Sequence, residues 1–449
     1  MHPYLPITEA ERRRMLDAAG AAAVEEFFVD IPVSVRCQST LNLPGPLPEM
    51  ELVSFMKGLA EKNLNTEGYA CFLGAGAYDH YIPAVIGHML LRQEFYTAYT
   101  PYQPEISQGT LQALFEYQTM ICELTGMEVS NASVYDGAVA LAEAVSMACS
   151  ATNRSEVLLA RTVHPEAREV IKTYSRFNGA EIVELGYDQN GVTCLQEAEE
   201  LVNDRTGAIV LQSPNFFGCL EALNKFAELA HRHKALFIVS ADPISLGLLQ
   251  SPGEAGADIV VGEGQGLGNP LSFGGPYFGF MATTGKLMRR LPGRIVGQTT
   301  DGDGKRGFIL TLQAREQHIR RGRATSNICS NQSLCVLAAT IYLTVLGKAG
   351  LKRVAELCLQ KAHYACEQLV GTGKFSPAFG APFFKEFVVT AQEDAASLNA
   401  RLLEQKLIGG YPLSGEYPEL GNALLIAVTE KRTRAEIDRL VKYSKGQNS

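Results

Sequence analysis

Four turns along the chain carry polar side chains directly after strand-like apolar runs. Asp136-Gly137 opens an alanine-rich helix whose first backbone amides could hold a phosphate group. His164, in ARTVHPEA, could lie flat against an aromatic ring, and Asn215, in LQSPNFFGCLE, could bond a ring substituent. Asp242 ends the apolar run LFIVSA and could hold a protonated ring nitrogen. Together these side chains suit a phosphorylated aromatic ring that contains nitrogen.

Three of the four turns also have an ordinary structural explanation. An Asp-Gly pair before a helix is a common turn and cap, and His164 stands beside Pro165 where a helix is expected to begin. Asp242 beside Pro243 fits a helix N-cap equally well. Taken singly, the turns do not decide between the two explanations, but their order along the chain is informative.

The loop after the next strand lacks the residue that such a site needs. The stretch ADIVVGEGQGLGNPLSFGGPYFGF (257–280) runs from a short strand into a glycine-rich loop, and no lysine occurs between Lys234 and Lys286. Phosphate turn, histidine, asparagine turn, aspartate and then this loop is the order of sites in fold-type-I pyridoxal-phosphate enzymes, which the chain resembles over roughly residues 70–449. In those enzymes a lysine in the loop holds the coenzyme as an imine. Gln265 or Gly266 stands in its place, and neither has an amine that could form the imine.

The elements that would position these turns alternate between strand and helix. Such spacing predicts an α/β fold with a mostly parallel sheet covered by helices on both faces, and ligands of such sheets bind beyond the carboxyl ends of the strands. The expected strands are 156–160, 181–185, 208–212, 235–240, 258–261 and 277–283.

Three parts are expected along the chain. Residues 1–70 form a helical arm with extended pieces at FVDIPVSV and LNLPGPLP, and residues 71–325 form the large α/β domain. Residues 326–449 form a long helix and a smaller α+β domain. The elements expected in this last part are helices at 331–346, 351–370 and 433–444 and strands at 385–391 and 423–429.

Two longer runs narrow the resemblance to one family. FYTAYTPYQPEISQGTLQALFEYQTMICELTGMEVSNASVYDGAVALAEA (95–144) and REQHIRRGRATSNICSNQSL (315–334) are similar to the glycine cleavage system P-protein, glycine dehydrogenase (decarboxylating). They resemble its N-terminal half, which in many bacteria is a separate chain, subunit 1. The resemblance implies that pyridoxal phosphate is bound covalently by a lysine-bearing partner, subunit 2, and not by this chain. The complex would then decarboxylate glycine and transfer the aminomethyl group to the lipoyl arm of the H-protein.

Fold-type-I sites are built at a dimer interface, so the resemblance further implies that this chain lends side chains to its partner. The candidates are Tyr96, Tyr99, Tyr102, Glu105 and Gln108 in YTAYTPYQPEISQG, and Arg323 and Asn327 in RRGRATSNIC. Three alternatives remain open. First, these segments could pack for shape alone or form a solvated basic face. Second, the whole chain could be a structural partner or an H-protein docking platform that contributes no catalytic side chain. A third alternative is an independent enzyme using Lys286, although that residue lies past the next strand.

Composition excludes several other classes of protein. A net charge of −8 argues against a nucleic-acid binder, and the longest mostly apolar run, 336–346, is too short to span a bilayer. The ten cysteines form no CxxC pair and the eight histidines no HxxxH pair, so we expect no metal site. Free thiols are typical of a reducing compartment and favour the cytoplasm.

Without a coenzyme ring, Asp242 would be left bare at the buried end of an apolar strand, which costs several kcal/mol. A side-chain donor, capping of backbone amides, or protonation would relieve this cost. We expect capping of the amides of Ile244 and Ser245, and therefore that Asp242→Asn is nearly harmless.

Overall fold

The computed structural model describes residues 6–37, 39, 41–313 and 316–445, and the chain divides into two compact units, 1–64 and 65–449. Arg315, the first residue of the run REQHIRRGRATSNICSNQSL, lies outside the described residues. The finer boundary expected near residue 326 stays a prediction. The first unit contains α1 (Glu9–Ala19), η1 (Val24–Phe28), η2 (Val33–Val35) and α2 (Glu49–Ala60).

The expectation of an extended piece at FVDIPVSV is wrong, because short 3-10 helices occupy much of it. The guanidinium of Arg36 donates hydrogen bonds to the carbonyl oxygens of Phe28, at 2.6 Å, and Ile31, at 2.8 Å. These bonds fold the segment back on itself, which local β propensity does not register.

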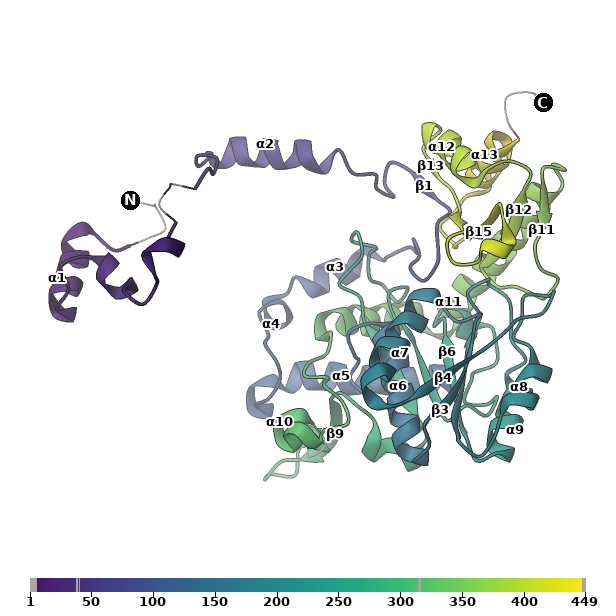
Figure 1. Cartoon of the computed structure of the whole chain (residues 1–449), viewed down its shortest axis with the longest axis horizontal. Helices are drawn as coiled ribbons and strands as arrows, with labels where there is room; N and C mark the ends of the chain where they lie inside the picture. The colour runs from purple at the N-terminus through teal and green to yellow at the C-terminus, as the bar shows by residue number, and fades with distance from the viewer. Residues whose placement is uncertain (1–5, 38, 40, 314–315, 446–449) are drawn as a thin grey trace. The chain divides into compact units, whose positions relative to one another are not determined.

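The second unit is built on a seven-stranded sheet in the order β2-β8-β7-β6-β5-β3-β4. Figure 1 labels β3, β4 and β6 of this sheet among helices α6 to α9. Neighbours from β7 to β4 run parallel, whereas β8 pairs antiparallel with both β7 and β2. The sheet therefore confirms the mostly parallel α/β fold. The strands are β2 (Val129–Ser130), β3 (Glu156–Ala160), β4 (Glu181–Leu185), β5 (Thr206–Ser213), β6 (Leu236–Ala241), β7 (Ile259–Glu263) and β8 (Gly279–Thr283).

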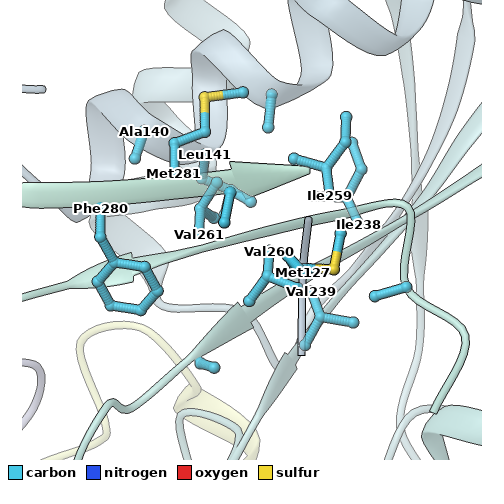
Figure 2. Close-up of a cluster of buried hydrophobic side chains, with 14 of the residues drawn as sticks. Met127, Ala140, Leu141, Ile238, Val239, Ile259, Val260, Val261, Phe280 and Met281 are labelled. Carbon is cyan, nitrogen blue, oxygen red and sulfur yellow. The ribbon is translucent and has the colours of Figure 1, made fainter. Parts of the chain in front are cut away.

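The central strands are almost continuously apolar, as expected where both faces of a sheet are covered. Figure 2 shows Ala140 and Leu141 of α6 beside Ile259 and Val261 of β7 in this core, and all four side chains are buried. The helices of this part are α3 (Ala84–Leu90), α4 (Gln93–Tyr96), α5 (Pro104–Thr125), α6 (Gly137–Thr152), α7 (Pro165–Asn178), α8 (Leu195–Leu201) and α9 (Leu223–Arg232).

The two helices expected at 331–346 and 351–370 form one long element, α11 (Ser333–Val370), which bends at Gly347. Gly347 has φ 58° and ψ −175°, a backbone conformation that glycine adopts more readily than other residues. By length and composition α11 could cross a membrane. Its buried side chains, among them Val336, Ala339 and Tyr342, instead belong to the core of the second unit.

The C-terminal part contains a four-stranded sheet in the order β11-β12-β15-β14, with all neighbours antiparallel. Of its strands, β12 and β15 were expected and the two short edge strands were not. Two smaller pairs of strands complete the described part of the second unit: β1 pairs in parallel with β13, and β9 pairs with β10 in an antiparallel hairpin. The remaining elements of the second unit are β1 (Ala70–Cys71), η3 (Ser245–Gly247), η4 (Gly285–Arg290), β9 (Ile295–Thr300), β10 (Arg306–Thr311), α10 (Gln317–Arg320), η6 (Arg321–Arg323), β11 (Phe375–Pro377), β12 (Glu386–Ala391), α12 (Ala395–Glu404), β13 (Leu407–Ile408), β14 (Tyr411–Pro412), η7 (Pro418–Leu420), β15 (Ala423–Ala427) and α13 (Arg434–Ser444).

Candidate functional site

A cavity of about 450 Å³ lies at the carboxyl ends of the central strands, where all four predicted turns meet; the turn that contains Asn215 contributes Gln212 and Pro214. Asp136, Gly137, His164 and Asp242 all line this cavity, although more than a hundred residues separate the first from the last. The parallel sheet brings them together because the carboxyl ends of its strands share one edge. The fold therefore assembles the expected pocket.

At one end of the cavity, the N-terminus of α6 already binds a carboxylate. The Gly137 amide donates to Glu263 Oε2 at 2.9 Å, and the Gln265 amide donates to Glu263 Oε1 at 3.0 Å. Asp136 Oδ1 accepts from the Val139 amide at 2.7 Å, so Asp136 caps the helix as its ordinary explanation requires. Burial raises the pKa of Glu263 to about 7, although its bonds to the Gly137 and Gln265 amides act in the opposite direction.

Elsewhere in the cavity lining, both oxygens of the Asp242 carboxylate are engaged. Oδ1 accepts from the Ile244 amide at 3.1 Å, and Oδ2 lies 2.7 Å from Lys385 Nζ. Capping is therefore confirmed at Ile244, whereas the Ser245 amide donates to the Asp242 carbonyl oxygen instead. The expectation that capping would be the main relief is wrong, because a buried lysine also neutralises the charge.

Lys385 directly precedes β12 in the C-terminal sheet, and its side chain is 2% exposed. Its ammonium lies 3.1 Å from His80 Nε2 and 3.5 Å from the centroid of the Tyr78 ring, in addition to its contact with Asp242. An ammonium group has three N–H donors, and these three acceptors account for all of them. Lys385 is thus fully partnered within the chain.

The contacts continue from Lys385 through His80. Since an ammonium can only donate, His80 Nε2 accepts from Lys385, and the ring proton lies on Nδ1, 2.6 Å from Glu430 Oε2. The Tyr81 amide donates to Glu430 Oε1 at 2.7 Å. Burial alone would raise the pKa of Glu430, but the interactions with His80 and Tyr81 outweigh it and lower that pKa to about 2.

The residues beside His80 fix the same loop to the C-terminal part of the second unit. Asp79 is paired with Lys431 at 2.8 Å and with Arg432 at 2.9 Å, and both Asp79 and Arg432 are buried. Removing either partner of such a buried pair is strongly destabilising. The loop 75–81 is therefore held firmly over the cavity.

His80, Cys358 and Glu430 also bring an imidazole, a thiol and a carboxylate within 4.8 Å of one another, which is a donor set that a metal ion could use. In the described residues these three side chains are instead hydrogen-bonded to one another. His80 bonds Glu430 directly, the Cys358 thiol lies 3.4 Å from Glu430 Oε2, and the Lys361 ammonium donates to the Glu430 carbonyl oxygen. The ammonium groups of Lys385 and Lys361 lie beside the cluster. Their positive charges would repel a metal ion, so they favour the hydrogen-bonded arrangement.

His164 lines the cavity but is fixed by the chain itself. Its Nδ1 accepts from the Glu166 amide at 3.2 Å, so the ring proton lies on Nε2, which donates to the Ala75 carbonyl at 2.9 Å. Its ring meets Phe216 edge-on, with centroids 4.9 Å apart. Burial lowers the pKa of His164, which keeps it neutral.

Two residues expected in the pocket have side chains that point elsewhere. Asn215 is buried and uses its side-chain amide to hold its own turn, bonding the Phe217 and Cys219 amides, the Gly191 carbonyl and Glu221. The Gln265 side chain bonds both backbone groups of Tyr78 and the Asn269 carbonyl. Of the two candidates for the lysine position, Gly266 lines the cavity and Gln265 does not.

The interface candidates divide into exposed and anchored residues. Tyr99 is 88% exposed and Tyr96 is 63% exposed, whereas the Tyr102 hydroxyl accepts from Arg294 at 2.9 Å. Gln108 is also anchored, because its side chain exchanges two hydrogen bonds with the Phe308 backbone in β10. The remaining candidates, Glu105, Arg323 and Asn327, are exposed.

Lys286 lies in η4 and lines a different cavity, of about 460 Å³, together with Arg289, Arg290 and Glu143. That cavity shares none of its lining residues with the pocket described above. The geometry therefore gives no support to Lys286 as a replacement for the missing lysine.

Comparisons with known proteins identify the family of the chain. A family model for the glycine cleavage system P-protein matches residues 2–443. The chain belongs to this P-protein family. Similar relatives named probable glycine dehydrogenase (decarboxylating) subunit 1 are found in Desulforamulus reducens, at 56% identity over 97% of this chain and 98% of the relative, and in Moorella thermoacetica, at 56% identity over 99% of each.

Solved structures place the chain in the same family. It superposes on a crystal structure of glycine decarboxylase (P-protein) of the glycine cleavage system, in inhibitor-bound form, with a TM-score of 0.91, 45% identity and coverage of 98% of this chain and 99% of that chain. A sphingosine-1-phosphate lyase from Burkholderia pseudomallei has a TM-score of 0.65 at 14% identity, covering 92% of this chain and 93% of that one, and shares the fold alone. The P-protein family has the predicted fold-type-I architecture, in which pyridoxal phosphate is the expected coenzyme.

The residues around this cavity do not fit that coenzyme. The loop position that faces the cavity is Gly266, which has no amine. The helix N-terminus is bonded to Glu263, and the carboxylate of Asp242 is bonded to Lys385. No step of the chemistry is therefore assigned to this cavity.

Proposed function

We propose that this chain is the subunit of a glycine dehydrogenase (decarboxylating) that does not carry the coenzyme. In this proposal the lysine-bearing partner, subunit 2, holds pyridoxal phosphate. The complex decarboxylates glycine and transfers the aminomethyl group to the lipoyl arm of the H-protein. The observation that carries the proposal is a fold-type-I cavity whose loop presents Gly266 instead of a lysine.

The exposed tyrosines support a contribution to the partner's site. Tyr96 and Tyr99 follow each other along one segment beside α4 and expose most of their rings. A large, rigid side chain with a polar tip is suited to an interface, and a phenol can bond a carboxylate or a phosphate. In this proposal Tyr96 and Tyr99 reach the partner, while Tyr102 fixes the end of the segment through Arg294.

The N-terminal unit supports assembly with a partner. Helix α2 contains no buried residue, and its exposed side chains include large apolar ones: Met50, Phe55 and Met56 are 80%, 56% and 54% exposed. An apolar surface of this kind marks a protein–protein contact. All ten cysteines are free thiols, which supports the proposal of a cytoplasmic enzyme.

The proposal is tested by mixing the two purified subunits with lipoylated H-protein and measuring release of carbon dioxide from glycine. We expect activity from the mixture and none from this chain alone. Activity of this chain alone would refute the proposal. A chain that acts purely as a structural partner or as an H-protein docking platform would also restore activity, so the tyrosine variants described in the Discussion separate these alternatives.

A further inference from the structure

Two charged side chains around the cavity match the charges that a phosphopyridoxal molecule would bring. Such a molecule carries an anionic phosphate at one end and a protonated ring nitrogen at the other. The chain places the carboxylate of Glu263 at the phosphate end and the ammonium of Lys385 at the ring-nitrogen end. We propose that Glu263 and Lys385 replace these two charges, so that the cavity excludes phosphopyridoxal molecules and acts as a permanent internal tie.

The phosphate end is closed by contact with the backbone. Helix α6 has 16 residues, and its N-terminus attracts an anion through free amides and the helix dipole. Glu263 satisfies this attraction from the last position of β7. A Cβ added to Gly137 would lie 2.8 Å from the Glu263 amide nitrogen, so the helix end and the strand end are already in contact. A phosphate could enter only if Glu263 left.

The position of the ring nitrogen is occupied by the Lys385 ammonium, which is fully partnered there. Each N–H of the Lys385 ammonium has an acceptor, in Asp242, His80 and the face of Tyr78. The remaining oxygen of Asp242 is bonded to the Ile244 amide. A pyridinium ring could bond Asp242 only by displacing a buried ammonium from all three of its partners.

The volume of the cavity does not exclude a ligand, since about 450 Å³ falls within the range of ordinary small-molecule sites. The exclusion therefore rests on Glu263 and Lys385, and substitutions of these two residues should reverse it. This reasoning also distinguishes the cavity from one that has simply lost its lysine, because adding a lysine at position 266 would leave both ends closed.

The same contacts join three separate parts of the second unit. Asp242 follows β6 of the large sheet, and Tyr78 lies in the loop 75–81. Lys385 directly precedes β12 of the C-terminal sheet, which begins at Glu386. Glu386 accepts from the Ala75 amide at 2.8 Å and from the Tyr78 hydroxyl at 2.7 Å. The internal tie therefore fixes the two sheets and the loop in one arrangement. This inference deepens the proposed function, on which it rests for the assignment of the coenzyme to the partner.

The test measures binding of pyridoxine 5′-phosphate, which has the phosphate and the ring nitrogen but no aldehyde that could react with surface lysines. Isothermal titration is carried out on the full chain as wild type, Glu263→Ala, Lys385→Met and the double variant. We expect no saturable binding to the wild type at millimolar concentration. Each substitution should raise the affinity by about tenfold or more, the usual effect of one hydrogen bond to a charged group, and the double variant should bind measurably.

Glu228→Ala and Lys225→Met, on the exposed face of α9, are the matched controls and should bind no better than the wild type. Near-UV circular dichroism checks that each variant is folded. Saturable wild-type binding, or a folded double variant that does not bind, would overturn the inference. If the double variant does not fold, a crystal of the wild type soaked with pyridoxine 5′-phosphate decides. A crystal in which Lys385 still contacts Asp242 supports the inference, and a crystal in which the ring of the added molecule contacts Asp242 overturns it. The mixing assay judges the proposed function separately, because it measures activity of the complex and not binding to this cavity.

Discussion

The substitution Asp242→Asn tests the internal tie directly, because the two accounts of this residue predict different costs. If Asp242 were a helix cap alone, asparagine would replace it with a loss of a few tenths of a kcal/mol. In the structure, Asp242 Oδ2 also lies 2.7 Å from an ammonium whose side chain is 2% exposed. Asparagine would leave the charge of Lys385 buried and unpaired.

The expected loss follows from the burial of this pair. Breaking a buried ion pair by removing one partner costs about 3–5 kcal/mol. The Asp242 side chain is 15% exposed, so we take the lower end and predict a loss of about 3 kcal/mol in the free energy of unfolding. Because no pyridinium is involved, the loss should be the same whether or not pyridoxal phosphate is added.

The measurement is a urea unfolding curve of the full chain, followed by circular dichroism, for the wild type, Asp242→Asn, Lys385→Met and the double variant. Since Lys385→Met removes the ammonium that Asp242→Asn would leave unpaired, the double variant should lose about 2 kcal/mol less than the sum of the single losses. A loss below about 0.5 kcal/mol for Asp242→Asn, with additive single variants, would refute the reasoning.

Three further predictions concern other parts of the chain. Burial raises the pKa of Glu386 to about 7, above the ordinary value of 4.5 that it has when unfolded, so the stability it contributes is fully present below pH 4.5 and is lost as the pH rises through 7. Glu386→Gln should therefore flatten the dependence of unfolding free energy on pH, and parallel profiles for variant and wild type would contradict this. Gly137→Ala should lower the free energy of unfolding by about 1–3 kcal/mol, because the added Cβ would lie 2.8 Å from the Glu263 amide nitrogen. The control Gly87→Ala in α3 places its Cβ in open space and should not destabilise the chain, so equal unfolding curves for the two variants would exclude the contact. Tyr99→Ala should leave the unfolding curve of this chain unchanged but lower glycine decarboxylation by the assembled complex by about tenfold or more, as loss of a bond to a charged group does. Full activity of both Tyr96→Ala and Tyr99→Ala would favour the alternative of a structural partner.

The sequence predicted the large sheet well because its strands are strongly apolar and separated by helices. All six strands expected in this sheet are present, whereas β2 in the same sheet and β1, β9 to β11, β13 and β14 elsewhere were not expected. Strands such as β2 and β11 have two or three residues, which is too short for a periodic pattern, and β2 in addition is formed by pairing with the distant strand β8.

The candidate site was predicted in outline and not in its contacts. The order of turns located the cavity, and it identified the missing lysine. Lys385 could not be assigned, because its partners Asp242 and His80 lie far away in the sequence and contact it only once the two sheets meet. The signal that was available is the charged pair in PFFKEFVV, where Lys385 and Glu386 interrupt an apolar run. Buried charges of this kind need partners, and such a pair in an apolar run indicates a polar cluster inside the fold.

The position of the coenzyme in the active complex tests the central claim most directly. The mixed subunits are reduced with borohydride, digested, and analysed by mass spectrometry for phosphopyridoxyl-lysine. The account predicts that the label lies on one lysine of the partner and that no peptide of this chain carries it in stoichiometric amount. A stoichiometric phosphopyridoxyl group on Lys286 or Lys385 of this chain would contradict it.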